Sequence, residues 1–154
     1  MKILVLGGSG FIGSHVTDAA LAAGHHVRVY DRARERFRET PADVEFVQGD
    51  LGDTASLAEA LAGVDTVFHL VSTTVPATAN LDPIADVQGN LVATIRLLEL
   101  MRAQNVPRML YLSSGGTVYG VPTMDPVPED HPLRPISSYG IVKVAVESYL
   151  DMYR

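Results

Sequence analysis

The chain has 154 residues, of which 47% are apolar and 19% are charged, a balance that suits one folded domain and argues against disorder. Its net charge of -6 offers no basic surface for nucleic acid or for an anionic membrane. Because the sequence contains no cysteine, disulfides, thiolate metal ligands and cysteine nucleophiles are excluded, and we expect a cytoplasmic protein without a bound metal.

Short apolar segments alternate with helical patterns along the chain. Those rich in Val, Ile, Leu and aromatic residues predict strands at 3–6, 27–30, 44–47, 66–71 and 109–112. Helices are predicted at 11–23, from 53 or 54 to 63, at 84–103, and from 137 or 138 onward. This alternation predicts an α/β fold with a doubly wound parallel sheet.

The first predicted strand runs into a glycine-rich turn, in which Gly7 and Gly10 precede the first helix and Gly13 lies in its first turn. Glycine permits a tight turn and close approach of the backbone to a pyrophosphate, whose charge the helix N-terminus favours. An ordinary strand-to-helix turn also contains glycines, but the strand before and the helix after this one are the context that a dinucleotide site needs. The turn therefore predicts a Rossmann fold with strand order 3-2-1-4-5.

Asp31 ends the second predicted strand, at the position of the acid that binds the adenosine ribose in such folds. A carboxylate there accepts hydrogen bonds from both ribose hydroxyls and repels a 2′-phosphate, so it favours NAD over NADP. An arginine beside the ribose would instead accommodate the phosphate of NADP. Four arginines follow Asp31 but alternate with glutamates, which favours a solvated face and NAD: Arg32, Arg34, Arg36 and Arg38.

Two segments, 72–83 and 115–136, are long for simple connectors. Both follow strand ends, where ligands bind in open α/β sheets. A dinucleotide fold of this kind normally continues into a sixth strand and a substrate-binding part. We therefore expect residues 1–154 to be the N-terminal, NAD-binding portion of a larger enzyme.

Tyr139 and Lys143 are four residues apart in the last predicted helix, so they project from the same face. A lysine ammonium one turn away, together with the positive nicotinamide ring, favours the phenolate form of a tyrosine. Such a tyrosine exchanges a proton with a substrate hydroxyl while hydride moves to or from the cofactor. The same spacing also occurs on solvent-facing helices, but its place after a Rossmann turn and a strand ending in Ser113 and Ser114 favours the redox pair.

Together these motifs resemble the extended short-chain dehydrogenase/reductases, specifically the NAD-dependent epimerase/dehydratase group, over the whole chain. The resemblance also rests on Gly49-Asp50-Leu51, Phe68-His69-Leu70, Asn90 ahead of Leu97-Leu98-Glu99, Val118-Tyr119-Gly120 and Tyr139-Gly140-x-x-Lys143.

The resemblance implies a role in cofactor binding for residues outside the motifs already described. Asp50 is implied to bond the adenine amino group and Asn90 to hold the helix and cofactor geometry, although a turn cap and a solvated helix residue are the alternatives. Lys143 is implied to bond the nicotinamide ribose as well as to influence Tyr139. The remaining implied cofactor contacts are Phe11, Ile12, Arg32, the Leu51 backbone, Leu70, Val71 and Ser72.

The family pattern places a catalytic hydroxyl three residues before Val118, where this sequence has Gly115. The nearest hydroxyls belong to Ser114 and Thr117, and we predict Ser114. Relatives that dehydrate or decarboxylate sugar nucleotides carry a carboxylate in this stretch, and residues 115–117 contain none. This favours a nucleoside-diphosphate-sugar 4-epimerase, which removes and returns the same hydride.

Two alternatives stay open at this point. One is an NAD(P)-dependent reductase of a sugar or small carbonyl compound, and the other is a non-catalytic nucleotide-binding regulatory domain, which Gly115 favours. The expected partners are a nucleotide-sugar substrate and a second copy of the chain. The resemblance implies that the homodimer forms through a four-helix bundle of helices 84–103 and 139–154.

Overall fold

The computed structural model describes residues 1–35 and 38–154, so Arg36 lies outside the described residues. The chain divides into two compact units. The first consists of Met1–Val71 and Arg96–Leu112, and the second of Ser72–Ile95 and Ser113–Arg154. Within the described ranges, no helix combines the length and apolar character needed to cross a membrane.

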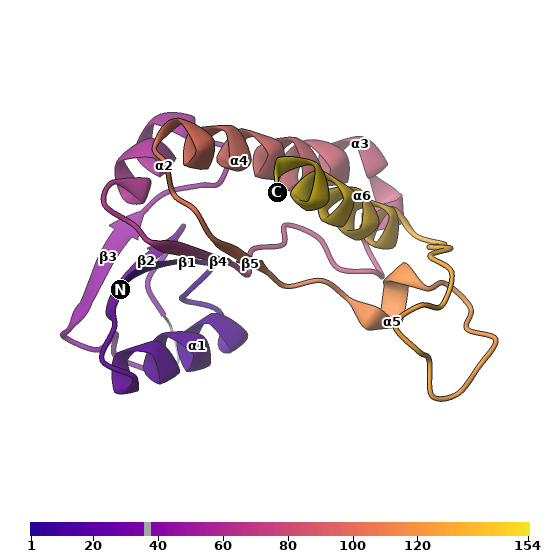
Figure 1. Cartoon of the computed structure of the whole chain (residues 1–154), viewed down its shortest axis with the longest axis horizontal. Coiled ribbons are helices and arrows are strands. Elements are labelled where there is room, and N and C mark those ends of the chain that lie inside the picture. Colours follow the sequence, from indigo (N-terminus) through magenta and orange to yellow (C-terminus); the bar gives the residue numbers. More distant parts are fainter. Residues whose placement is uncertain (36–37) are drawn as a thin grey trace. The chain divides into compact units, whose positions relative to one another are not determined.

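The first unit is built on a five-stranded parallel sheet of order β3-β2-β1-β4-β5 (Figure 1). Its strands are β1 (Lys2–Leu6), β2 (His26–Asp31), β3 (Val44–Gln48), β4 (Thr66–His69) and β5 (Met109–Tyr111). The predicted fold class and strand order are therefore confirmed. The last two strands end earlier than predicted, at His69 and Tyr111.

The parallel register brings the carboxyl ends of the inner strands to one edge of the sheet. Leu6 pairs with Tyr30 on one side and with His69 on the other. The glycine turn after Leu6, Asp31 after Tyr30 and Leu70 after His69 therefore leave the sheet at the same level. This edge is where ligands bind in open parallel sheets.

Helices cover both faces of this sheet. α1 (Phe11–Ala22) lies on one face and α2 (Thr54–Leu61) on the other, as right-handed crossovers require (Figure 1). Of the two predicted starts of α2, Asp53 is its cap, because its carboxylate accepts from the backbone N–H groups of Ala55 and Ser56. On the α1 face the core consists of Ile3, Val5, Ala20, Val27 and Val29.

The second unit is mainly helical, and it is less regular than the sequence predicts. The single helix expected at 84–103 is instead α3 (Pro83–Asp86), a π-helical segment η2 (Val87–Val92) and α4 (Ala93–Ala103), whose last residues belong to the first unit. The Thr94 hydroxyl donates to the Asn90 carbonyl over 2.6 Å. Such a bond to the carbonyl four residues earlier slightly destabilises and often bends helices.

The other elements of the second unit are a 3₁₀ turn η1 (Ala79–Leu81), the short α5 (Gly115–Val118) and α6 (Ser138–Tyr153). Ser137 caps α6, because its hydroxyl accepts from the Gly140 N–H over 3.2 Å, and the predicted start of this helix is confirmed. α5 was not predicted, since the Gly115-Gly116 pair disfavours a helix.

Candidate functional site: a dinucleotide cradle and a tyrosine–lysine pair

The glycine turn of the first unit has a backbone that only glycine fits. Gly7 has a φ of +80°, and its N–H donates to the Tyr30 carbonyl over 2.9 Å. A Cβ atom on Gly13 would lie 2.1 Å from the Gly7 carbonyl oxygen and 2.6 Å from the Gly8 Cα. Gly13 therefore lets the first turn of α1 press directly on the loop, which leaves the helix end open.

The N-terminus of α1 carries features of an anion site. Its cap residue Gly10 has no side chain to accept the N–H groups of the first turn. These groups and the helix dipole favour a negatively charged ligand. Phe11 and Ile12 flank this end and are 75% and 50% exposed, so apolar surface lies beside the polar N–H groups.

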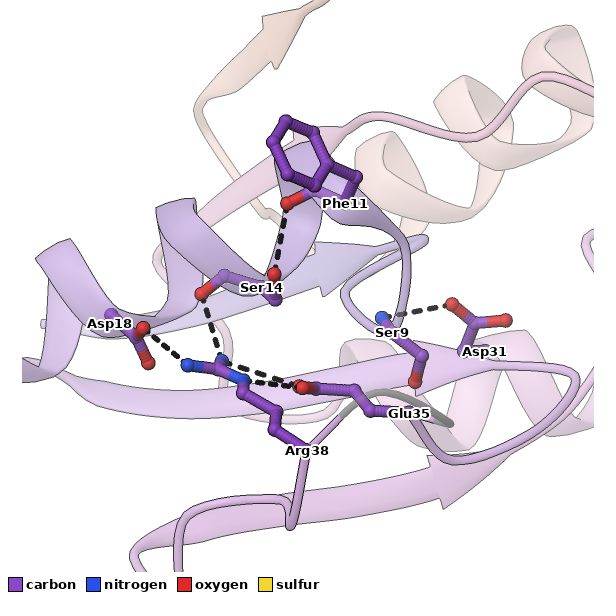
Figure 2. Close-up of polar contacts among 7 residues, drawn as sticks. All are labelled: Ser9, Phe11, Ser14, Asp18, Asp31, Glu35 and Arg38. Atoms are coloured by element: carbon purple, nitrogen blue, oxygen red, sulfur yellow. Dashed lines mark hydrogen bonds and ion pairs between the residues drawn. The ribbon is translucent and has the colours of Figure 1, made fainter.

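Asp31 lies against this turn (Figure 2). One carboxylate oxygen accepts from the Ser9 N–H over 3.0 Å, and the other accepts from the Arg32 N–H over 2.7 Å. The carboxylate is therefore fixed at the end of β2, next to the loop that would hold a pyrophosphate. This is the location that the ribose-binding prediction requires.

The arginines that follow Asp31 do not form a phosphate site among the described residues. The Arg38 guanidinium pairs with Asp18 and Glu35 and donates to the Ser14 carbonyl over 3.1 Å, as Figure 2 shows. The hydrogen bond from Arg38 lowers the pKa of the Asp18 carboxyl. The Arg38 guanidinium is therefore occupied by contacts with helix α1 and with Glu35 of its own loop.

The other described arginines of this loop agree with the predicted solvated face. Arg34 lies over the Phe46 ring at 4.5 Å from the ring centre, and Arg32 is exposed, with its carbonyl accepting from the Gln48 amide. These placements support the interpretation that the described part of the loop lacks a receptor for a 2′-phosphate, which favours NAD.

Asp50 and Leu51 follow β3 in the first unit. One Asp50 carboxylate oxygen accepts from the Gly52 N–H over 2.9 Å, which is the turn cap considered above, but the side chain remains exposed. The Asp50 carbonyl accepts from the Tyr30 hydroxyl over 2.8 Å, and burial raises the pKa of that phenol. Leu51 is 5% exposed, so only its backbone is left for a ligand.

Three predicted cofactor contacts follow β4. The Leu70 N–H donates to the Leu6 carbonyl over 3.1 Å, and a Cβ on Gly7 would lie 3.1 Å from a Val71 methyl. Leu70 and Val71 are thus beside the glycine turn, within the first unit. Ser72 opens the second unit, is exposed, and donates its hydroxyl to the Thr74 carbonyl.

Tyr139 and Lys143 form a close pair in the second unit. Tyr139 lies in the first turn of α6, and the Lys143 Nζ is 5.4 Å from the centre of its ring. Lys143 is 6% exposed, and burial lowers its pKa to about 8, while the charges of Glu147 and Asp86 act in the opposite direction. The geometry places a cation beside a half-buried phenol, as proton exchange through Tyr139 requires.

Ser114 caps the short helix α5 with its backbone. Its carbonyl accepts from the N–H groups of Thr117 and Val118, but its hydroxyl makes no capping bond. The Thr117 hydroxyl instead donates to that same carbonyl over 3.2 Å. The Ser114 side chain is therefore the better candidate for the substrate-facing hydroxyl, while Gly115 borders open space that an added side chain would enter freely.

Asn90 is buried in the π-helical segment and is not a solvated helix residue. Its side-chain oxygen accepts from the Thr73 N–H, and its amide donates to Asp86 over 2.8 Å. The sequence did not single out Asp86, although a carboxylate four residues before Asn90 on a helix was a usable signal.

An open apolar groove of about 560 Å³ lies elsewhere in the first unit, between α1 and the sheet. Val16, Ala23 and Thr66 are among its lining residues, and Thr66 is at the amino end of β4. Ligands of open parallel sheets bind at the opposite ends of the strands. None of the predicted site residues lines this groove.

The features of the first unit fit a dinucleotide. The helix end that Gly13 leaves open suits the pyrophosphate, the Asp31 carboxylate suits the ribose hydroxyls, and the apolar side chains of Leu70 and Val71 suit an aromatic ring.

Comparison with known proteins agrees with this chemistry. The model of the NAD dependent epimerase/dehydratase family matches residues 3–154. A UDP-glucose 4-epimerase of Mycolicibacterium smegmatis is 41% identical over 162 residues, an alignment that covers 100% of this chain and 51% of the relative.

Solved structures show the same relation. The Thermus thermophilus UDP-glucose 4-epimerase in complex with NAD matches with a TM-score of 0.91 at 36% identity, over 99% of this chain and 50% of that one. The Thermotoga maritima UDP-glucose 4-epimerase with UDP-glucose matches with a TM-score of 0.91 at 32% identity, over 99% and 51%. This chain thus spans about half the length of the relatives it matches.

Proposed function

Because this chain belongs to the NAD-dependent epimerase/dehydratase family, we propose that it is the NAD-binding portion of an enzyme that inverts C4 of a UDP-sugar. Relatives that cover the whole chain are named UDP-glucose 4-epimerases, and they support the substrate class. The observation that carries the chemistry is the buried Lys143 amine 5.4 Å from the Tyr139 ring.

Residues of the first unit would bind and orient the cofactor. The N–H groups at the start of α1 would hold the pyrophosphate, and Asp31 would accept the ribose hydroxyls of the adenosine half. When bound, NAD supplies a hydride acceptor that takes a hydride from a sugar carbon and returns it to the opposite face.

Residues of the second unit would handle the proton. Tyr139 would take the proton of the sugar hydroxyl as the hydride leaves and give it back as the hydride returns, so no net oxidation occurs. The Lys143 ammonium would stabilise the phenolate and bond the nicotinamide ribose. Ser114 would donate a hydrogen bond to the reacting sugar oxygen, because its hydroxyl makes no capping bond to α5.

The absence of a carboxylate from residues 115–117 favours epimerisation over dehydration. Dehydration needs an added acid or base near the hydroxyl that leaves, and this stretch, Gly115-Gly116-Thr117, contains no carboxylate. The Thr117 hydroxyl is bonded to a backbone carbonyl. The remaining groups are sufficient for removal and return of one hydride and one proton.

The proposal includes a cytoplasmic homodimer that pairs through helices of the second unit. Large apolar side chains are exposed there, including Ile84 of α3 at 71% and both Ile141 and Met152 of α6 at 54% and 66%. A helix that buried such a stripe against a second copy would remove this surface from water. Sedimentation of the protein with and without an Ile141→Glu substitution tests the dimer.

The test of the proposed function is UDP-galactose to UDP-glucose interconversion by the complete protein that carries this chain. Tyr139→Phe should lower kcat by about 10²- to 10⁴-fold, the usual effect of losing a general acid/base, while NAD still binds. Tyr149→Phe, on the same helix, is the matched control and should retain the wild-type rate. A Tyr139→Phe protein with a near-normal rate would contradict the proposed chemistry.

A further inference from the structure

The most completely buried carboxylate among the described residues outside the proposed chemistry is that of Asp86, at the end of α3. Its exposed fraction is 0%, and its oxygens accept hydrogen bonds from three side chains. Thr74 donates over 2.6 Å and Asn90 over 2.8 Å to one oxygen, and Ser138 donates over 2.6 Å to the other. A buried carboxylate is costly to desolvate unless its lone pairs are used in this way.

The three donors come from three different segments of the second unit. Thr74 lies in the loop that opens the unit, and Asn90 in the π-helical segment also accepts from the Thr73 N–H of that loop. Ser138 is the first residue of α6, directly before Tyr139. Asp86 is therefore the point at which the loop, the π-helical segment and the start of α6 are joined.

A second contact confines the same turn of α6. The Ser138 N–H donates to the Asn80 side chain over 2.8 Å. A Cβ on Gly140 would lie 2.8 Å from the Thr117 carbonyl oxygen, so the turn also packs tightly on α5. The Ser138 hydroxyl connects this tightly packed turn to the buried Asp86 carboxylate.

We propose that Asp86 is a positioning residue for Tyr139, which it holds in place through the hydrogen bond to Ser138 and its anchors at Thr74 and Asn90. This role rests on the proposed function of Tyr139. Misplacement of a reacting group by about 1 Å costs on the order of a hundredfold in rate, so a small shift of this turn is enough to matter. Asp86 does not contact the substrate in this proposal and positions Tyr139 through Ser138.

The charge of Asp86 also acts on Lys143, whose pKa it raises against the effect of burial. Among the groups that oppose the effect of burial on the Lys143 pKa, Glu147 contributes more than Asp86. An Asp86→Asn side chain keeps an oxygen for Thr74 and Asn90, and its amide can donate to the Ser138 hydroxyl. The conservative substitution should therefore retain the function, whereas Asp86→Ala should not.

The test measures kcat for UDP-galactose epimerisation and the Kd for NAD in the complete protein. Asp86→Ala should lower kcat by about ten- to a hundredfold with an unchanged NAD Kd. The Asp86→Asn protein should instead keep a kcat within about threefold of wild type. Ser138→Ala should lower kcat too, and adding it to Asp86→Ala should cause no further loss, because both remove one link. Ser148→Ala, exposed on the same helix with its hydroxyl bonded to the Val144 carbonyl, is the control and should be silent.

A readout that needs no turnover separates this proposal from the proposed function. Hydrogen exchange at the Ile141 N–H, which donates to the Ser137 carbonyl, should be faster in Asp86→Ala and Ser138→Ala and unchanged in Ser148→Ala. Unchanged exchange, additive losses, or an Asp86→Asn protein as slow as Asp86→Ala would overturn the role of Asp86. A wild-type rate that survives Tyr139→Phe would instead overturn the function of Tyr139.

Discussion

The buried amine of Lys143 should make the stability of the fold depend on alkaline pH. Its pKa is about 8 in the folded chain against 10.5 for an exposed lysine. Below about pH 8 both states carry the proton, and the folded state bears the whole cost of burying the ammonium. Between the two pKa values only the unfolded chain holds the proton, so stability rises as the pH rises through this window.

The size of the effect follows from the gap between the two pKa values. Each unit of difference between the folded and unfolded pKa corresponds to about 1.4 kcal/mol of stability, so the full gap corresponds to about 3 kcal/mol. Residual solvent screening of the lysine reduces this to about 2 kcal/mol. Lys143→Met has a similar length and no titrating group. It should remove this contribution and leave the apolar packing of the side chain in place.

The assay is urea unfolding of the Lys143 and Lys143→Met proteins at about pH 7 and about pH 10, both carrying Tyr139→Phe so that position 139 has no ionisable group. The difference in unfolding free energy between the two proteins should move in favour of lysine by about 2 kcal/mol at the higher pH. Other titrating groups cancel in this difference. A difference that stays constant would refute the argument that burial sets the lysine pKa.

Further substitutions test the proposed cofactor-binding residues of the first unit and the position of Gly115. Asp31→Ala should narrow the preference for NAD over NADP at least about tenfold in calorimetric titrations, since it removes a charge that repels the 2′-phosphate; an unchanged ratio would assign the discrimination elsewhere. Arg38→Met should leave that ratio unaltered and lower the unfolding free energy in urea by about 1 kcal/mol, because its pairs with α1 are partly exposed; weaker NADP binding would show that Arg38 reaches the phosphate. Gly13→Ala should abolish measurable NAD binding, since its Cβ would lie 2.1 Å from the Gly7 oxygen, and near-normal affinity would mean that the loop yields. Gly115→Ser should fold normally and raise the epimerisation rate by up to about tenfold, with Gly115→Ala as the control that adds bulk without a hydroxyl.

The sheet, and the edge of it where the glycine turn and Asp31 lie, could be predicted because their signals are local. Each strand is a short apolar run, and the crossover rules then leave few ways to order five of them. The glycine turn was recognisable because Gly7 and Gly13 meet steric demands that no other residue meets. The fate of Arg38 could not be predicted, because its partner Asp18 comes from a different element and only the folded loop brings the two together.

The helical unit was harder to predict because its irregularities come from buried polar side chains. The pattern at 84–103 fits one long helix by apolar spacing alone. The bond from the Thr94 hydroxyl to the Asn90 carbonyl lies where that helix is interrupted, and so does the bond that Asn90 accepts from the Thr73 N–H. Asp86 was missed because apolar spacing alone does not reveal a buried carboxylate, although its position four residues before Asn90 was a usable signal.

The π-helical segment η2 also has a consequence for how sequences of relatives are aligned. A π turn accommodates one more residue than an α turn, so such a segment is geometrically equivalent to an α-helix with one residue inserted. A relative whose helix is regularly α-helical here should therefore align with a one-residue gap within 87–92. Forcing a gapless alignment through this segment would rotate every later helical position by about 100° and would assign the role of Asn90 to a neighbour on the wrong face.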